Sequence, residues 1–289
     1  MYTIENDILK VVVKSKGAEL DSIYNKNTGL EYMWNADPAF WSKKSPVLFP
    51  IVGTLKNDTY YYENKSYSLS RHGFARETDF TVTEQGLTSL TFTLQNNDIT
   101  MAKYPFLFQF DIIYSISGNK LSVTYKVENR GEKEMYFSVG GHPAFKVPLI
   151  SGTSYSDYYL EFNNPENAGR WPISKDGLIE KNTEPVFNNA KKLALTKGLF
   201  YKDALVFKNL NSDKVSLRSD KNTHGLEFDF SGFPFLGIWA FKNADFVCIE
   251  PWCGIADSVD TDQQLVDKEG INKLAANTTF EKTWFLKAF

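Results

Sequence analysis

Apolar and polar side chains alternate with a period of two through most of the chain. Over residues 88–94, Leu90, Phe92 and Leu94 alternate with Ser and Thr, and residues 120–129 repeat the pattern with Leu, Val and Tyr. Because successive side chains of a strand point to opposite faces of a sheet, this period indicates strands with one buried face. The same pattern recurs at 8–13, 108–116, 135–139, 204–210, 214–219, 225–230, 236–241, 245–250 and 280–289.

Clusters of Gly, Asn, Asp, Ser and Pro separate these segments and predict turns. Residues 260–270 alone have a helical pattern, with an Asp-Thr start and a Gly stop, and residues 37–41 could add one helical turn. A long polar stretch, 163–189, is interpreted as a surface loop. Since no repeat or linker divides the chain, we predict one domain over residues 1–289. Its fold class is all-β, with two large antiparallel sheets packed face to face and few short helices.

Composition narrows the choice of partner and compartment. The chain has 289 residues, 42% of them apolar, which is enough for an extended core, and a net charge of -3 without basic blocks. Nucleic acid and membrane partners are therefore not expected. The acidic and basic residues near the N-terminus do not suit a signal peptide, so we expect a cytoplasmic protein. Cys248 and Cys253, with no histidine beside them, form an incomplete zinc set; two reduced thiols are favoured over a disulfide.

His142 is the first candidate for chemistry. It follows Gly140 and Gly141 and precedes Pro143, in a chain with only three histidines. The glycines would let a ligand approach the backbone, and the proline holds His142 in an extended conformation at a strand end. An imidazole titrates near neutral pH and suits general acid or base catalysis. The alternative is that the Gly-Gly-His-Pro segment only forms a turn.

Glu250 is the second candidate. It ends an apolar strand, precedes Pro251 and lies near Trp252, so burial should raise the pKa of its carboxyl group toward the range of a general base. His142 and Glu250 thus share one arrangement, a proton-transfer residue before a proline at a strand end. The alternative for Glu250 is a structural ion pair with an arginine such as Arg71 or Arg76.

The combined residue set suits a neutral polyhydroxy ligand. Arginine and aspartate side chains hold sugar hydroxyls, and aromatic rings pack on the C–H faces of sugars. The sequence contains no nucleophile elbow, phosphate-binding loop, dinucleotide fingerprint, zinc-protease motif or calcium loop. These observations favour a carbohydrate ligand.

The chain resembles the aldose 1-epimerase (mutarotase) superfamily, and within it the LacX-type, galactose mutarotase-related group. The resemblance spans essentially the whole length and rests on six motifs in order. They are SPVLFPIVGTLKND (45–58), RHGFARE (71–77), GGHPAF (140–145), KDALVF (202–207), LGIWAF (236–241) and CIEPWCGIADS (248–258).

The resemblance implies a galactose mutarotase-like supersandwich whose groove binds an aldohexose, with no metal and no organic cofactor. By motif, His142 resembles the general acid and Glu250 the general base, while His72 resembles the second histidine of the site. Asp203 resembles the aspartate that holds sugar hydroxyls. Arg71 and Arg76 are the expected sugar- or phosphate-binding arginines, and His224 matches no functional element. The implied activity is interconversion of α and β anomers by acid/base ring opening and closure.

Two departures from the family pattern leave the sugar open. The galactose-type enzymes have a longer H-x-Y-F-N signature where this chain has GGHPAF. The hexose-6-phosphate type has an Arg-Gly-Gly element where this chain has Ser42, Lys43 and Lys44. The alternative functions are therefore a hexose-6-phosphate 1-epimerase and a non-catalytic carbohydrate-binding protein. We expect the chain to be a monomer or a homodimer. Glycoside hydrolysis ranks last, because it needs two carboxylates flanking the scissile bond and the strongest one here is matched with a histidine.

Overall fold

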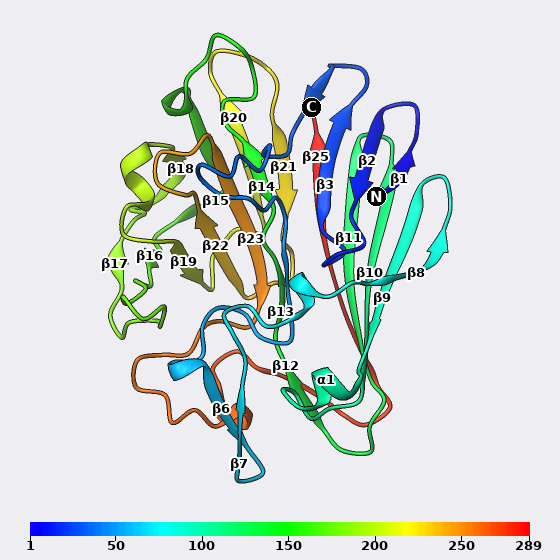
Figure 1. Ribbon diagram of the computed structural model, residues 1–289. Helices are drawn as coiled ribbons and strands as arrows, with labels where there is room; N and C mark the ends of the chain where they lie inside the picture. Colours follow the sequence, from blue (N-terminus) through cyan, green and yellow to red (C-terminus); the bar gives the residue numbers. More distant parts are fainter.

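Two large antiparallel sheets dominate the computed structural model, which describes residues 1–289 (Figure 1). The larger sheet has nine strands in the order β18-β15-β20-β21-β25-β11-β10-β9-β8. The predicted all-β class with two large sheets is confirmed. The strands are β8 (Thr81–Gln85), β9 (Ser89–Gln95), β10 (Phe108–Ser117), β11 (Lys120–Asn129), β15 (Tyr158–Glu166), β18 (Ala190–Ala194), β20 (Lys214–Ser219), β21 (Leu226–Asp229) and β25 (Thr279–Ala288).

The second sheet carries the residues of interest for function. It has six strands, five in the order β19-β22-β23-β13-β5, with β14 also pairing to β23. One edge of β23 is therefore shared by two short strands that follow each other in the chain. The strands are β5 (Val47–Leu48), β13 (Val139–Gly141), β14 (Ala144–Lys146), β19 (Leu205–Lys208), β22 (Phe235–Trp239) and β23 (Phe246–Cys253).

Smaller sheets complete the architecture. An N-terminal sheet pairs its strands in chain order, and the other three are two-stranded. Figure 1 shows both chain ends on the same side of the molecule, beside the β2–β3 hairpin. These strands are β1 (Tyr2–Glu5), β2 (Leu9–Val13), β3 (Leu20–Asn25), β4 (Leu30–Glu31), β6 (Thr59–Tyr62), β7 (Lys65–Ser68), β12 (Met135–Phe137), β16 (Gly169–Arg170), β17 (Glu184–Pro185) and β24 (Asn272–Leu274).

Helical structure is confined to single turns. The one α-helix, α1 (Asp98–Met101), begins at a capping box formed by Asn97 and Thr100, which sequence reasoning missed. No helix here has the length and hydropathy needed to span a membrane. The 3-10 turns are η1 (Lys56–Asp58), η2 (Ala75–Glu77), η3 (Tyr155–Asp157), η4 (Lys197–Phe200) and η5 (Leu265–Asp267).

The predicted helix over 260–270 is wrong, because only η5 forms there. Gln263 has a φ of 65°, which interrupts a right-handed helix. Its side-chain amide donates to the carbonyl oxygens of Lys56 and Thr59 at 2.8 and 3.0 Å, and its own carbonyl accepts from Tyr61 N–H. Contacts with a distant strand thus replace the helical hydrogen bonds. Residues 38–40 form a hydrogen-bonded turn rather than a helix.

The core lies between the sheets and is rich in aromatic rings. One cluster joins 69 buried apolar residues. Phe49 stacks on Phe110 at 4.5 Å between ring centroids, and Phe145 of β14 meets Phe228 of β21 at 5.9 Å. A second cluster of 9 residues, which includes Ile179, Val206 and Trp252, lies beneath the pocket described next. Rigid apolar packing therefore supports the strands that carry the polar candidates.

Candidate active site

Strand register places His142 opposite Glu250. Gly140 of β13 pairs with Trp252 of β23, and Ala144 of β14 pairs with Cys248 of β23. His142 lies midway between these two pairs and therefore faces Glu250 of β23. Directly opposed residues of antiparallel strands have Cβ atoms about 5 Å apart. The result is a contact of 3.3 Å between His142 Nε2 and Glu250 Oε2.

The prediction that Glu250 ends its strand is wrong, because β23 continues through Pro251 to Cys253. Proline lacks the N–H of a ladder hydrogen bond and is tolerated where a strand has no partner. Here that gap lies between β13, which ends at Gly141, and β14, which begins at Ala144. The two prolines thus mark one interruption of the sheet, and the interruption opens the His142–Glu250 pair to the pocket.

The two glycines before His142 serve packing rather than ligand approach. A Cβ on Gly140 would lie 2.7 Å from the Trp252 ring, and one on Gly141 would lie 2.5 Å from the Tyr125 hydroxyl. Neither glycine has a positive φ. They let β13 lie close to Trp252 and to the larger sheet, which fixes the backbone that carries His142.

Burial controls the protonation of the pair. His142 is 8% exposed and Glu250 is 2% exposed. Burial lowers the pKa of His142 to about 3. Burial also raises the pKa of Glu250 well above its ordinary value, with the nearby charge of Asp203 acting in the same direction. No arginine lies within 4.0 Å of Glu250, so the alternative of an arginine ion pair is not what the structure shows.

His72 lies on the adjoining wall between two N–H donors. The Gly53 N–H donates to His72 Nδ1 at 3.1 Å, and Arg71 Nε lies 3.3 Å from His72 Nε2. A neutral imidazole has only one acceptor nitrogen, and the pKa of His72 is lowered by burial. Both ring nitrogens therefore face N–H donors of the protein, and the neutral ring can accept from only one of them at a time.

Two of the predicted residues have backbone conformations that L-residues rarely adopt. His72 has a φ of 69° and Asp203 a φ of 80°. The Asp203 carboxylate accepts the N–H of the next residue, Ala204, at 2.7 Å, which stabilises that turn. Backbone strain of this kind is concentrated at functional sites because the surrounding structure must maintain it.

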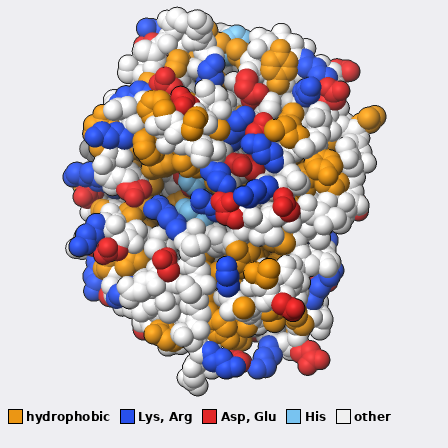
Figure 2. Space-filling view, viewed as in Figure 1, with side chains coloured by type: hydrophobic (Ala, Val, Ile, Leu, Met, Phe, Trp, Pro, Cys, Tyr) orange, Lys and Arg blue, Asp and Glu red, His pale blue; other side chains and the backbone are white.

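One pocket of about 480 Å³ brings the predicted residues together. Ligand sites commonly have this size. Figure 2 shows histidine side chains near the centre of the viewed face, with Lys and Arg side chains beside them. Apolar lining comes from Trp41, Ile173, Ile179, Trp239 and Trp252, among others. All six predicted site residues line it, namely Arg71, His72, Arg76, His142, Asp203 and Glu250.

The arginines of the pocket have little neutralisation from the protein. Arg71 has no carboxylate within 4.0 Å, and Arg76 Nε reaches only Glu77, at 3.8 Å. Burial lowers the pKa of Arg76, and the charge of Arg71 adds to this effect. Lys242 also lines the pocket. The site is therefore electropositive, which suits an anionic or hydroxyl-rich ligand.

Only one cluster of side chains could supply ligands to a metal ion, and it includes His142 and Glu250. Atoms of His142, Cys248 and Glu250 lie within 4.8 Å of one another. Burial raises the pKa of both the Cys248 thiol and the Glu250 carboxyl group. Metal ligands must lose their protons, so the dry environment of these groups opposes metal binding.

The comparisons with known proteins agree with this geometry. The family model of aldose 1-epimerase matches residues 1–264. The chain belongs to the aldose 1-epimerase family. Protein LacX (chromosomal) of Lactococcus lactis subsp. lactis is 36% identical, over 97% of each chain.

Two solved relatives extend the match to three dimensions. A galactose mutarotase-related enzyme from Lactobacillus acidophilus is 39% identical, with a TM-score of 0.95 over 100% of this chain and 97% of the other. A galactose mutarotase-like protein from Lactobacillus casei is 32% identical, with a TM-score of 0.92 over 100% of both chains. The galactose mutarotase-like fold expected from the motifs is thereby confirmed.

The lysines that stand in place of the hexose-6-phosphate-type Arg-Gly-Gly element lie outside the pocket. Lys43 Nζ binds Glu77 at 2.8 Å, and Lys44 Nζ binds Asp21 at 3.2 Å. Neither lysine is among the residues that line the pocket. The positive charge near His142 and Glu250 comes instead from Arg71, Arg76 and Lys242.

Several pocket residues of this epimerase family member escaped sequence reasoning. Residues 163–189 are not only a surface loop, because Ile173, Gly177 and Ile179 form part of the wall. The only signal was the apolar residues within a polar stretch, such as Trp171, Ile173, Leu178 and Ile179. Trp41 and Trp239 also line the pocket, and nothing in their local patterns distinguishes them from core tryptophans.

Proposed function

We propose that this chain catalyses the cofactor-free interconversion of the α and β anomers of an aldohexose. The observation that carries the proposal is the contact of 3.3 Å between His142 Nε2 and Glu250 Oε2 in the pocket. An acid and a base side by side can act on the ring oxygen and the C1 hydroxyl of one sugar. The family assignment supports a sugar as the substrate.

The reaction conserves the single transferable proton of the pair. Ionised Glu250 takes the proton of the C1 hydroxyl, protonated His142 gives its proton to the ring oxygen, and the C1–O5 bond breaks to leave the open-chain aldehyde. The protein then holds a neutral carboxyl group and a neutral imidazole. Rotation about C1–C2 followed by the reverse transfers closes the ring on the other face.

The environment of the pair favours the open-chain stage. Burial lowers the pKa of His142 and raises the pKa of Glu250, so both side chains are neutral by preference. This is the protonation state that accompanies the open-chain aldehyde. The ion pair that acts on the cyclic sugar has the same proton count, and it forms by transfer between Oε2 and Nε2.

The other predicted residues would hold the sugar while C1 turns. His72 contacts sugar hydroxyls, Asp203 accepts from them, and Arg71 and Arg76 donate to sugar oxygens. Fixing the remaining hydroxyls converts the proton transfers into reactions between positioned groups.

The test is anomer exchange on freshly dissolved α-glucose and α-galactose, followed by polarimetry or NMR. We expect at least one sugar to equilibrate faster than in buffer alone, and His142→Gln to remove that acceleration. His224→Gln is the matched control, because His224 lies outside the pocket, and it should retain full activity. Binding of a sugar without accelerated exchange would favour a non-catalytic carbohydrate-binding protein.

A phosphorylated hexose is a second candidate, supported by Arg71, which has no carboxylate within 4.0 Å, and by Arg76, whose one carboxylate contact is Glu77 at 3.8 Å. A sugar 6-phosphate would supply the missing negative charge. The test compares kcat/KM for glucose and galactose with that for their 6-phosphates, with inorganic phosphate as competitor. We expect Arg76→Gln to lower kcat/KM more for the phosphorylated sugars; equal losses would exclude a phosphate role for Arg76.

A further inference from the structure

Trp41 lies on the ring of the proposed general acid. Its indole stacks on the His142 imidazole with 5.0 Å between centroids and 30° between planes. It also stacks on Phe246 at 5.5 Å and meets Trp239 edge-on at 5.4 Å. We propose that Trp41 is a positioning residue that sets the orientation and the dryness of His142, an inference that rests on the proposed function.

The imidazole of His142 lacks the hydrogen bond that usually orients a catalytic histidine. Its Nδ1 is buried and has no hydrogen-bond partner, while Nε2 is directed to Glu250. Ring contacts must therefore hold the plane of the imidazole. Trp239 and His72 lie edge-on to it, at 5.6 and 5.8 Å between ring centroids, and Trp41 is the aromatic ring that stacks on its face.

Hydrogen bonds within residues 33–45, the segment that carries Trp41, hold its backbone in place. The Trp34 indole N–H donates to the Trp41 carbonyl at 2.8 Å, and the Trp41 N–H donates to the Asp37 carbonyl at 2.9 Å. The ring can therefore act as a fixed support rather than a mobile cover.

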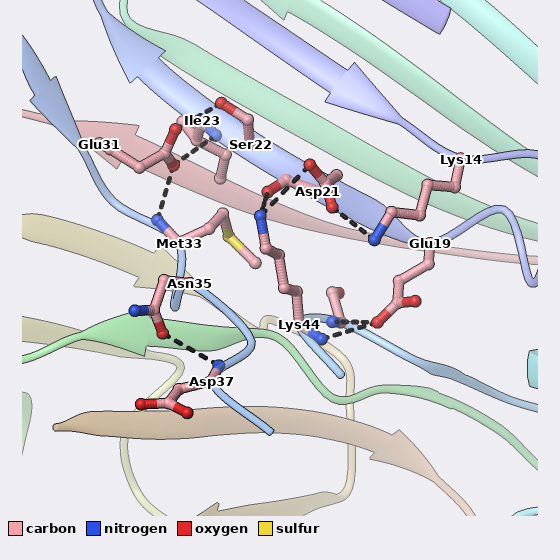
Figure 3. A network of polar contacts seen from close by, with 11 residues as sticks. Lys14, Glu19, Asp21, Ser22, Ile23, Glu31, Met33, Asn35, Asp37 and Lys44 are labelled. Atoms are coloured by element: carbon pink, nitrogen blue, oxygen red, sulfur yellow. Dashed lines mark hydrogen bonds and ion pairs between the residues drawn. The ribbon is translucent and has the colours of Figure 1, made fainter. Parts of the chain in front are cut away.

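Both ends of this segment are tied to the N-terminal sheet, as Figure 3 shows. At the start, Glu31 Oε1 accepts the Met33 N–H at 2.8 Å. At the end, Glu19 Oε1 accepts the N–H groups of Lys44 and Ser45 at 2.7 and 3.0 Å. Buried and half-buried carboxylates thus hold the backbone on either side of the indole.

The stack affects the chemistry of His142 in two ways. By excluding water, Trp41 contributes to the burial that keeps the imidazole neutral. By covering one face of the ring, Trp41 also holds the imidazole in the plane from which Nε2 reaches Glu250. The charged and titratable groups facing His142 are Glu250 and Cys248 on β23 and Arg71, His72 and Arg76 on the adjoining wall.

The kinetic test compares Trp41→Ala with Trp41→Phe. For Trp41→Ala we expect kcat to fall about 10- to 100-fold with KM changed less than about threefold, and for Trp41→Phe most of kcat to return. A large rise in KM at unchanged kcat would make Trp41 a sugar platform and overturn the proposal.

Phe40→Ala is the matched control within the same segment. Phe40 packs on Trp34 and Phe241 and faces a separate cavity, without contact to His142. We expect it to keep kcat within about twofold. A loss equal to that of Trp41→Ala would show that the segment as a whole matters, not the stack, and would overturn the proposal.

A double-mutant cycle tests whether Trp41 acts through His142. In the His142→Ala background, Trp41→Ala should cost no further activity, because the group it positions is gone. An additive loss would overturn the proposal.

NMR titration of the His142 ring gives a readout that does not need activity. Its signal is assigned by its absence in His142→Ala. In Trp41→Ala we expect the pKa to rise by about one unit or more toward ~6.5, since water reaches the imidazole. An unchanged pKa would overturn the proposal. A wild-type chain that exchanges no anomers would refute the proposed function, whereas this titration would still test the stack.

Discussion

Glu250 shows the conflict between activity and stability at the scale of one residue. Burial raises the pKa of its carboxyl group well above the ordinary value, so the folded chain keeps this proton to a higher pH than the unfolded chain does. Each unit of that rise costs about 1.4 kcal/mol of folding stability above the ordinary pKa. The proposed base is therefore a residue whose environment destabilises the fold.

Glu250→Gln should abolish accelerated anomer exchange and raise the melting temperature. The amide cannot accept the C1 proton, and it removes the preference of the unfolded chain for an ionised carboxylate. We expect a gain of at least about 1 kcal/mol, or ~2 °C or more, by calorimetry. Glu132→Gln, at an exposed position, is the control and should change neither property. Retained activity would remove Glu250 from the mechanism.

The pH dependence of kcat/KM should be bell-shaped with an unusually acidic lower limb. The pair holds one transferable proton between the pKa of His142, about 3, and the raised pKa of Glu250. Below the lower value both groups are protonated, and above the upper value both have lost the proton. Stopped-flow polarimetry over pH 3–10 would measure this. A lower limb centred near ~6.5, the ordinary histidine pKa, would contradict the neutral pair.

Two substitutions of Asp203 can distinguish the backbone strain at this residue from its proposed contact with the ligand. Asp203→Asn should preserve the melting temperature, because Asn tolerates a positive φ and can still accept the Ala204 N–H. Asp203→Ala should cost a further ~1 kcal/mol. Both variants should raise KM about tenfold by losing a charged hydrogen bond to the sugar. Equal stability of the two variants would show that the backbone strain is relieved without the side chain.

At the scale of elements, a buried ion pair supports the loop that orients His72. Lys268 Nζ and Asp257 Oδ1 are 2.7 Å apart, with side-chain exposures of 3% and 2%. Asp257 also accepts the Lys56 N–H through Oδ2 and donates its own N–H to the Thr54 carbonyl. The pair therefore joins η5 to the turn that follows Gly53.

Lys268→Met should lower the free energy of unfolding by about 3 to 5 kcal/mol, since it leaves a buried carboxylate without its cation. Urea denaturation would measure the loss. Adding Asp257→Asn, which removes the charge but keeps an acceptor for Lys56, should recover part of the stability. A double variant no more stable than Lys268→Met would contradict this electrostatic explanation.

The same elements show what a sequence can and cannot predict here. Alternation in residues such as Leu90, Phe92 and Leu94 located the strands because it reports directly on one buried face. The helix over 260–270 failed because hydrogen bonds from Gln263 to a distant strand outweighed a local pattern. Trp41 escaped because stacking on His142 depends on tertiary structure, and no local pattern encodes it.

At the scale of the whole molecule, the reactivity of the two buried cysteine thiols can measure how often the fold opens. Cys248 and Cys253 are 0% and 2% exposed, and both are free. Five residues of extended strand separate their Cα atoms by about 16 Å, which is too far for a disulfide.

Neither thiol should react with a chromogenic disulfide reagent in the native protein, and both should react in denaturant. The native reaction rate should follow the fraction of molecules in which the sheet that contains β23 is open, so it should slow when stability rises. Glu250→Gln should therefore react more slowly than the parent chain. A fast-reacting thiol in the folded protein would show that β23 is accessible from the pocket.

The interruption of the sheet at His142 and Pro143 restricts insertions and deletions in this part of the chain. Because side chains alternate between faces, adding or deleting one residue between Gly141 and Ala144 would turn the imidazole toward the opposite layer. Residues 172–183, which connect β16 to β17 beside the pocket and belong to neither large sheet, have no such constraint. Insertions beside the pocket that change its ligand preference are thus compatible with the fold. The number of residues between Gly141 and Ala144 must stay fixed.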